Sequence, residues 1–265
     1  MRTLGWMIVN AAQVAFLAVV SSILMIVAFV SRILGPDAPL QVAGRLWAPA
    51  LLWISGSKFE IEGGEAVDWK KPHLFLMNHQ SALDIPVAFA AIRSPVRFVA
   101  KKVLGRVPVL GWYMLATRMI LVDREKGSQA IAAIQIAADR LRRGANILIY
   151  PEGTRSKDSR ILPFKKGPFV VALQAQVPIV PLVVHGAAQV MPRGTFRVRP
   201  STIRVKIGAP IPTEGLGVKH RDELMFLVRE QMLEMHRSIG GEGGEPSEPV
   251  RRGPREAARE ARHAG

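Results

Sequence analysis

The pattern of hydrophobic and polar positions divides this chain of 265 residues into three parts. Residues 6–30 form an uncharged, mostly apolar run, and residues 46–54 form a second, shorter one. Short apolar runs then alternate with amphipathic segments, and the chain after residue 239 is rich in Gly, Glu, Pro and Arg. We therefore expect N-terminal membrane helices over residues 1–56, a folded domain over residues 57–239 and a disordered tail over residues 240–265.

The run over residues 6–30 is long enough to enter a membrane. As a helix it extends about 37 Å, and the hydrocarbon core of a bilayer is about 30 Å thick. It is also too long for the apolar part of a typical signal peptide. Either it crosses the bilayer, or it forms a hairpin in one leaflet with residues 46–54. Basic residues are more frequent after the run, which favours the cytoplasmic face of the membrane for the folded domain.

The middle part predicts an α/β fold. Residues 128–143 place Ala138 and Leu141 on one apolar stripe and are followed by Gly144, as in an amphipathic helix. Strands interleaved with such helices predict a mixed or mostly parallel sheet flanked by helices. The expected strands are 58–62, 73–77, 97–100, 119–122, 147–150 and 179–184, with one or two more in 196–207 and a last helix in 219–239.

The composition narrows the possible partners and chemistry. The formal net charge is +15 and the tail after residue 239 is neutral, so the folded part favours anionic partners. The absence of cysteine excludes disulfides, thiolate metal sites and a cysteine nucleophile. His, Asp and Glu show no metal-ligand spacing, and we expect neither a metal nor another cofactor.

The first candidate catalytic pair is His79 and Asp84. His79 follows the apolar run 73–77, so it should lie at the carboxyl end of a strand, where open α/β sheets place their sites. Ser81 can cap the next helix, and Asp84 has a capping-box-like spacing from it that returns the carboxylate toward the histidine. Asp84 would then orient the His79 ring as a general base. The alternative is a capping aspartate beside a structural histidine.

The second motif, Glu152-Gly153-Thr154-Arg155, follows another apolar run. Gly153 permits a turn, and Arg155 can present a planar guanidinium to a phosphate. Lys101 and Arg124 also follow expected strands, and with Arg155 they would surround one phosphate group. The alternative is a strand-ending turn with a surface ion pair. The two motifs together indicate acyl transfer to an acceptor that bears a phosphate.

In this order, with Val177-Pro178-Ile179-Val180-Pro181 downstream, the motifs resemble the glycerolipid acyltransferase family over residues 59–212. The family includes 1-acyl-glycerol-3-phosphate acyltransferases. The resemblance implies their α/β fold and transfer of an acyl group from acyl-CoA or acyl carrier protein to the sn-2 hydroxyl of a lysophospholipid, giving phosphatidate at a membrane. It also implies catalysis by His79 and Asp84 and substrate binding by Lys101, Arg124, Glu152, Gly153, Thr154, Arg155 and Pro178.

Three alternatives remain at this stage. The acceptor could be another lysolipid, such as lyso-ornithine lipid, or glycerol-3-phosphate. A membrane-tethered binder of anionic lipid or nucleic acid predicts basic residues interleaved with aromatic ones or clustered on one element. Lys101, Arg124 and Arg155 instead follow separate expected strands beside a His/Asp pair, and we expect no nucleic-acid partner. A hydrolase would need a nucleophile or a metal, and the Gly-x-Ser-x-Gly motif is absent.

Overall fold

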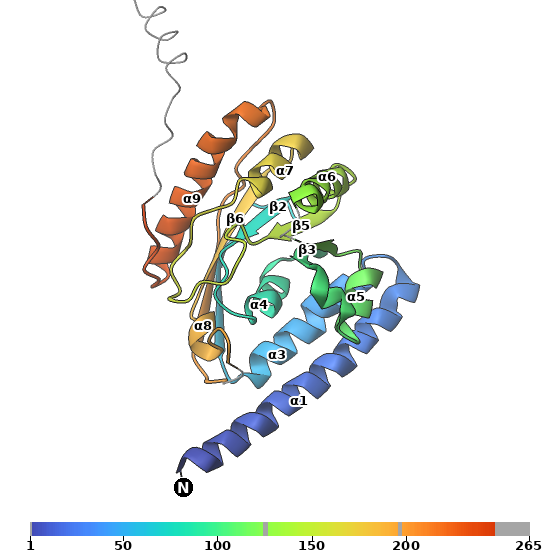
Figure 1. Cartoon of the computed structure of the whole chain (residues 1–265), viewed down its shortest axis with the longest axis vertical. Helices are drawn as coiled ribbons and strands as arrows, with labels where there is room; N and C mark the ends of the chain where they lie inside the picture. Colours follow the sequence, from blue (N-terminus) through green and yellow to red (C-terminus); the bar gives the residue numbers. More distant parts are fainter. Residues whose placement is uncertain (1, 124–126, 196–197, 247–265) are drawn as a thin grey trace, which may run out of the picture.

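The computed structural model describes residues 2–123, 127–195 and 198–246. Within these residues, seven strands form one sheet in the order β1-β7-β6-β2-β5-β3-β4 (Figure 1). Neighbouring strands run parallel, apart from the antiparallel pair β6 and β7. This confirms the predicted mostly parallel sheet. The strands are β1 (Lys58–Gly63), β2 (Leu74–Met77), β3 (Val96–Lys101), β4 (Ile120–Val122), β5 (Asn146–Ile149), β6 (Ile179–His185) and β7 (Thr202–Ile207).

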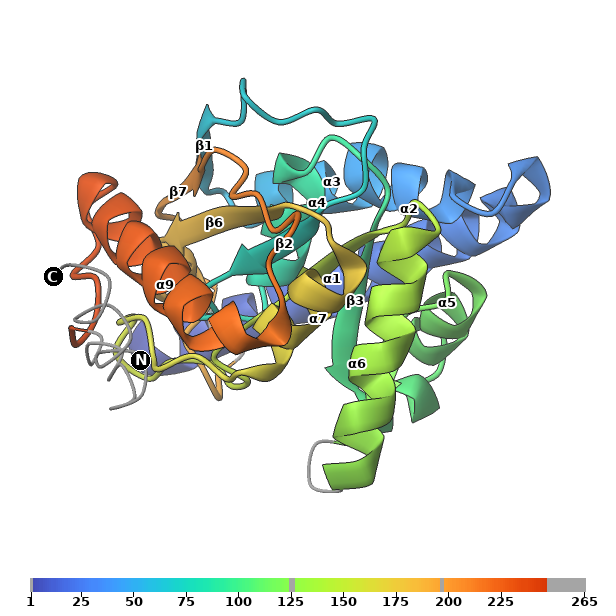
Figure 2. The ribbon, with the colours of Figure 1, turned by 90° about the horizontal axis from the view of Figure 1, so that it is seen from above.

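Helices cover both faces of the sheet (Figure 2). The N-terminal helices, α4 and α5 cover one face, and α6, α7 and α9 cover the other. Ala138 and Leu141 of α6 are fully buried, whereas Ile131 near its start is exposed. The helices and helical turns are α1 (Arg2–Val30), η1 (Ser31–Leu34), α2 (Ala38–Val42), η2 (Ala43–Trp47), α3 (Ala48–Ile54), α4 (Asp84–Ala91), η3 (Lys102–Arg106), α5 (Leu110–Ala116), α6 (Gly127–Arg142), α7 (Gly167–Ala175), α8 (Ala187–Val190), η4 (Val218–His220) and α9 (Arg221–Ser238).

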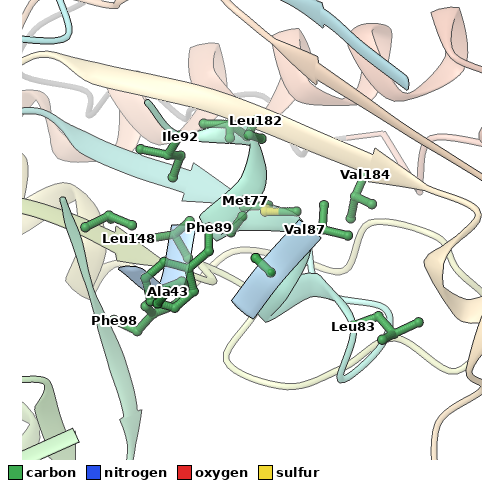
Figure 3. Packing of buried hydrophobic residues seen from close by; sticks show 14 of the residues in the cluster. Ala43, Met77, Leu83, Val87, Phe89, Ile92, Phe98, Leu148, Leu182 and Val184 are labelled. Carbon is green, nitrogen blue, oxygen red and sulfur yellow. The ribbon is translucent and has the colours of Figure 1, made fainter. Parts of the chain in front are cut away.

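The central strand β2 supplies apolar side chains to both layers. Phe75 and Met77 join the cluster under α4, and Leu74 and Leu76 join the cluster under α6 and α7. Successive side chains of a strand point to opposite faces, so a strand covered on both sides is apolar throughout. Figure 3 shows Met77 among the packed side chains of the α4 face. This packing fixes the end of β2, from which the site is built.

The N-terminal helices belong to the same core as the rest of the domain. Ala28 of α1, Leu40 of α2 and Trp47 of η2 are buried in the cluster that contains Phe75. The indole Nε1 of Trp47 also donates a 2.8 Å hydrogen bond to Oγ of Ser21 in α1. Buried side chains between Ala28 and Leu52 therefore contribute to the core of the folded domain. Among the described residues, no helix is long and apolar enough to span a membrane, and membrane helices stay a prediction.

The first residues of the expected tail have contacts with the folded domain. Residues 240–246 lie against the domain, where the carbonyl of Gly243 accepts a 2.7 Å hydrogen bond from the N–H of Ile161. Arg160 forms a 2.8 Å ion pair with Glu242. Backbone hydrogen bonds and charge hold this segment without large apolar side chains, which is why composition alone placed it outside the domain. The rest of the expected tail lies outside the described residues.

Candidate active site

The catalytic pair predicted from the sequence comes together at the carboxyl end of β2. His79 lies in the loop after β2, and Asp84 is the first residue of α4. Nδ1 of His79 lies 2.7 Å from Oδ2 of Asp84. The same oxygen accepts hydrogen bonds from the backbone N–H groups of Gln80 (2.6 Å) and Ser81 (2.8 Å). The turn before α4, closed by a 3.4 Å hydrogen bond from the N–H of Asp84 to the carbonyl of Ser81, thus returns the carboxylate toward the histidine, as the capping-box-like spacing predicted.

These hydrogen bonds determine which ring nitrogen of His79 is available for chemistry. Oδ2 of Asp84 already accepts two backbone N–H groups and acts as an acceptor toward Nδ1, so Nδ1 carries the ring hydrogen. Nε2 is then the nitrogen that can accept a proton. The Asp84 side chain is fully buried, whereas the His79 side chain keeps 18% of its surface exposed. The histidine can therefore meet a substrate while the aspartate orients it from inside the protein.

The ring of Tyr150 stacks on the ring of His79. Their centroids are 4.0 Å apart and the planes differ by 15°. Tyr150 follows β5, which pairs with β2, so the two rings extend from neighbouring strands. Burial raises the pKa of Tyr150 well above its ordinary value of 10, and the phenol stays neutral. The stack restricts the imidazole on one face, while Asp84 restricts rotation at Nδ1.

The carboxylate of Glu152 joins the two motif-bearing loops. Oε1 accepts a 2.7 Å hydrogen bond from the backbone N–H of His79, and Oε2 accepts a 3.0 Å bond from the N–H of Leu162. Burial raises the pKa of Glu152 to about 8, while the two backbone hydrogen bonds act in the opposite direction. The sequence placed Glu152 at the phosphate end of the substrate. The structure instead turns it inward, because both oxygens are used by backbone donors.

Three cationic side chains line the cavity that contains His79. Lys101 ends β3, Arg155 lies in the loop after β5, and Arg193 lies between α8 and β7. Nη1 of Arg193 donates a hydrogen bond to the backbone carbonyl of Arg155, which joins their loops. Gly153 and Thr154 also line the cavity, and Gly153 has φ of 74°, a value that favours glycine. The turn thus brings Arg155 to the same carboxyl edge of the sheet as His79.

Pro178 lies at the opposite edge of the sheet. It precedes β6, which runs parallel to β2, and its carbonyl accepts a 3.1 Å hydrogen bond from the N–H of Leu74 at the start of β2. A strand rises about 3.3 Å per residue, so the length of β2 separates Pro178 from His79. The structure therefore contradicts its expected place in the substrate site, and it serves the start of the strand. Arg124, which was also expected at the phosphate, lies outside the described residues.

A cavity of about 740 Å³ extends from His79 into the layer of helices. Its walls come from α1, η2, α3, α4, β3, η3 and α5 and are mainly apolar, whereas His79 and the three cations meet at the carboxyl edge of the sheet. This size and this separation of polar and apolar groups suit an amphipathic ligand. Among the described residues, no group of His, Asp and Glu side chains could hold a metal ion. The apolar lining includes Met25, Leu51, Phe89, Phe98, Leu110 and Met114.

Comparisons with known proteins agree with this arrangement. The acyltransferase family model matches residues 58–185. An uncharacterized acyltransferase of Schizosaccharomyces pombe is 33% identical over 84% of this chain and 81% of its own length. The chain belongs to the acyltransferase family. A 1-acyl-sn-glycerol-3-phosphate acyltransferase of Limnanthes douglasii is 34% identical over 71% of this acyltransferase and 66% of the plant protein.

A solved structure shares the fold of this acyltransferase. It is the crystal structure of the 1-acyl-sn-glycerophosphate acyltransferase PlsC from Thermotoga maritima, with a TM-score of 0.77. The superposition covers 90% of this acyltransferase and 98% of the Thermotoga chain, at 24% sequence identity. At that identity the likeness establishes the architecture, and the chemistry rests on the site itself.

Sequence reasoning missed two side chains of the acyltransferase site. Tyr150 was visible beside the second motif, but the pairing of β5 with β2 is what places its ring on His79. Arg193 belongs to no motif, and nothing in its local sequence distinguishes it from other surface arginines. Ser81 Oγ donates a 2.7 Å hydrogen bond to the carbonyl of Met191, and this bond holds the loop that carries Arg193 beside the loop that carries His79.

Proposed function

We propose that this acyltransferase moves a fatty acyl group from a thioester donor, acyl-CoA or acyl carrier protein, to the free sn-2 hydroxyl of 1-acyl-glycerol-3-phosphate, giving phosphatidate. The observation that carries the proposal is the His79–Asp84 pair in an apolar cavity, with Lys101 and Arg155 beside it. Lysophosphatidate has the matching parts, which are an apolar chain, a hydroxyl and a phosphate. The name of the Limnanthes relative supports the same acceptor.

The reaction needs one base and no covalent enzyme intermediate. Nε2 of His79 accepts the proton of the acceptor hydroxyl as its oxygen attacks the thioester carbonyl, and Asp84 stabilises the imidazolium that forms. The tetrahedral intermediate then collapses, its C–S bond breaks, and the imidazolium returns the proton to the thiolate. The products are the new ester and the free thiol, and His79 is regenerated.

The cations at the carboxyl edge of the sheet would select the acceptor by its charge. A guanidinium can form two parallel hydrogen bonds to a phosphate, and charge-assisted bonds of this type are the stronger ones. Arg155 fits this role through its position beside Thr154 in the cavity lining, with Lys101 adding a second charge. Arg124, which comes two positions after β4 in the sequence, is proposed for the same phosphate.

The apolar helices suggest where the enzyme works. The cavity wall includes side chains of α1 that come from the uncharged N-terminal run, among them Ala18 and Met25. A lipid chain would enter such a cavity from a bilayer with little exposure to water. We propose that the enzyme works on the cytoplasmic face of the membrane, with residues 1–56 in contact with lipid and the positive charge of the chain facing anionic headgroups.

The test is an assay of detergent-purified protein with labelled lysophosphatidate and either long-chain acyl-CoA or acylated carrier protein. Formation of labelled phosphatidate by the wild type, and its loss in His79→Ala, is the expected result. Parallel reactions with lyso-ornithine lipid and glycerol-3-phosphate identify the preferred acceptor. Faster turnover of either one than of lysophosphatidate would overturn the proposed substrate, and turnover by His79→Ala close to the wild-type rate would overturn the proposed base.

A further inference from the structure

A cluster of large apolar side chains is exposed on the segment that runs from η3 into α5. It consists of Val103, Val107, Trp112 and Leu115, of which the last two are 61% and 63% exposed. Trp112 and Leu115 are three residues apart and share one side of α5, whereas Tyr113 between them is buried. Single exposed apolar residues are common, but a cluster of this kind marks an interaction surface. We call these four residues the α5 patch.

Exposed apolar side chains also lie on α1, the helix that α5 contacts. Helix α5 packs against α1 (Figure 1). On its outer side α1 exposes a stripe of large apolar residues with helical spacing, and η1 continues it. The exposed residues of this stripe include Phe16, Val19, Ile23, Val27, Val30, Ile33 and Leu34.

The inner side of the same segment forms part of the cavity wall. Leu104 of η3 and Leu110 of α5 line the cavity, as does Met25 of α1. The η3 and α5 segment therefore has the α5 patch on its outer side and the proposed acyl site on its inner side. Whatever covers the patch lies directly against the wall of that site.

The charges around the patch favour lipid over a second copy of this chain. Lys102 and Arg106 are exposed and alternate with Val103 and Val107. A symmetric dimer through this surface would bring the same cations toward each other. An anionic bilayer instead offers headgroups for the cations and acyl chains for the apolar residues, and tryptophan is typical of that interface.

We propose that residues 102–116 form a second membrane contact, which inserts Trp112 and Leu115 into the acyl boundary of an anionic bilayer while Lys102 and Arg106 bind its headgroups. The inference rests on the proposed membrane location and adds an element outside the N-terminal helices. It predicts that two separate parts of the chain, α1 and α5, hold the cavity wall against the lipid surface.

The chain has no cysteine, which permits a direct measurement of insertion. Leu115→Cys carries an environment-sensitive fluorophore, and the full-length protein is mixed with vesicles that contain phosphatidylglycerol and brominated lipid chains. We expect a blue shift and quenching by the bromines. The matched control is Leu227→Cys on α9, a residue that is 54% exposed in the helical layer on the other face of the sheet, and its label should stay in water. Vesicle-bound protein with an aqueous label at position 115 would overturn the inference and leave the proposed function intact.

Two double variants test how much the apolar and the basic residues of this segment contribute to vesicle binding. Trp112→Glu with Leu115→Glu should reduce binding to anionic vesicles about tenfold or more, because two apolar side chains no longer leave water. Lys102→Gln with Arg106→Gln should reduce binding to anionic vesicles on the order of fivefold for each charge removed, at low salt, because each cation attracts the anionic headgroups. Activity on acceptor dispersed below its micelle concentration should stay unchanged in both, and Leu227→Glu should bind as the wild type does. If the glutamate pair altered the oligomeric state without weakening vesicle binding, the patch would be a protein interface and the inference wrong.

Discussion

The backbone N–H of His79 donates a 2.7 Å hydrogen bond to Oε1 of Glu152, a residue 73 positions later in the chain. The other carboxylate oxygen accepts a bond from the N–H of Leu162, so one buried side chain holds the base-bearing loop to the loop that carries Arg155. Asp84 holds the ring of His79 through Nδ1, and Glu152 holds the backbone of the same residue through its N–H.

Glu152→Gln should destabilise the protein and slow turnover. The amide nitrogen must replace one of the two acceptor oxygens and then faces a backbone N–H, which leaves a buried donor without an acceptor. We expect the free energy of unfolding to fall by about 1–3 kcal/mol. Chemical denaturation in detergent measures the stability, and Glu65→Gln, on the exposed loop after β1, is the control. Unchanged stability would show that the Glu152 hydrogen bonds contribute nothing.

The stability of the wild type relative to Glu152→Gln should depend on pH. The pKa of Glu152 is raised by burial from 4.5 to about 8, so the folded state holds this proton more tightly than the unfolded state. The resulting stabilisation is fully present below pH 4.5 and is lost as the pH rises through about 8. The difference in unfolding free energy between the two proteins should therefore decrease over that window. A difference that grows with pH would mean that the backbone donors outweigh burial.

Asp84→Asn should impair turnover while the fold persists. One oxygen of Asp84 serves three N–H donors, and an asparagine cannot reproduce the charge that stabilises the imidazolium. We expect kcat to fall about 10²-fold or more, within the range for loss of general-base catalysis. The exposed Asp68→Asn is the matched control. An Asp84→Asn enzyme with a tenth or more of wild-type kcat would show that the orientation of His79 does not need the carboxylate.

Arg155→Ala and Arg193→Ala should weaken the use of lysophosphatidate. A charge-assisted contact to phosphate contributes roughly 1.5–3 kcal/mol, which corresponds to a tenfold to hundredfold loss in kcat/KM for Arg155. We expect a smaller loss for Arg193, which lines the cavity and also donates to the backbone of Arg155. Arg199→Ala, an exposed residue outside the cavity lining, is the control. If both changes affected only the KM of the acyl donor, these arginines would bind the donor instead.

Two truncations separate the contribution of residues 240–246 from that of residues 247–265. Deletion after Pro246 should leave specific activity within about twofold, because the removed residues are poor in large apolar side chains. Deletion after Ile239 should reduce both stability and activity. It removes the partners of Ile161 and Arg160, which lie in the loop that Glu152 holds to His79. Equal activity of the two truncated proteins would show that residues 240–246 do not support that loop.

Some contacts of the site could be predicted from residues that are close together in the sequence. His79 and Asp84 are five positions apart, and the short turn ahead of α4 is enough to bring them together, so the sequence predicted their contact. The same holds for the turn at Gly153, whose positive φ favours glycine. Pro178 shows the limit of a motif, because its place at the amino edge of the sheet depends on the direction in which β6 runs beside β2.

The sequence by itself determined the alternating strands and helices, the contact of His79 with Asp84 and the turn that carries Arg155, because each depends on neighbours within a few residues. The tertiary structure decided that Glu152 points inward, that Tyr150 stacks on His79, that Arg193 joins the cavity and that α1 forms its wall. These contacts join residues far apart in the chain, and they depend on which strands pair and which helices cover each face. The pairing of strands and the placement of helices depend on packing of the whole core, so they cannot be predicted from the spacing of residues within one segment.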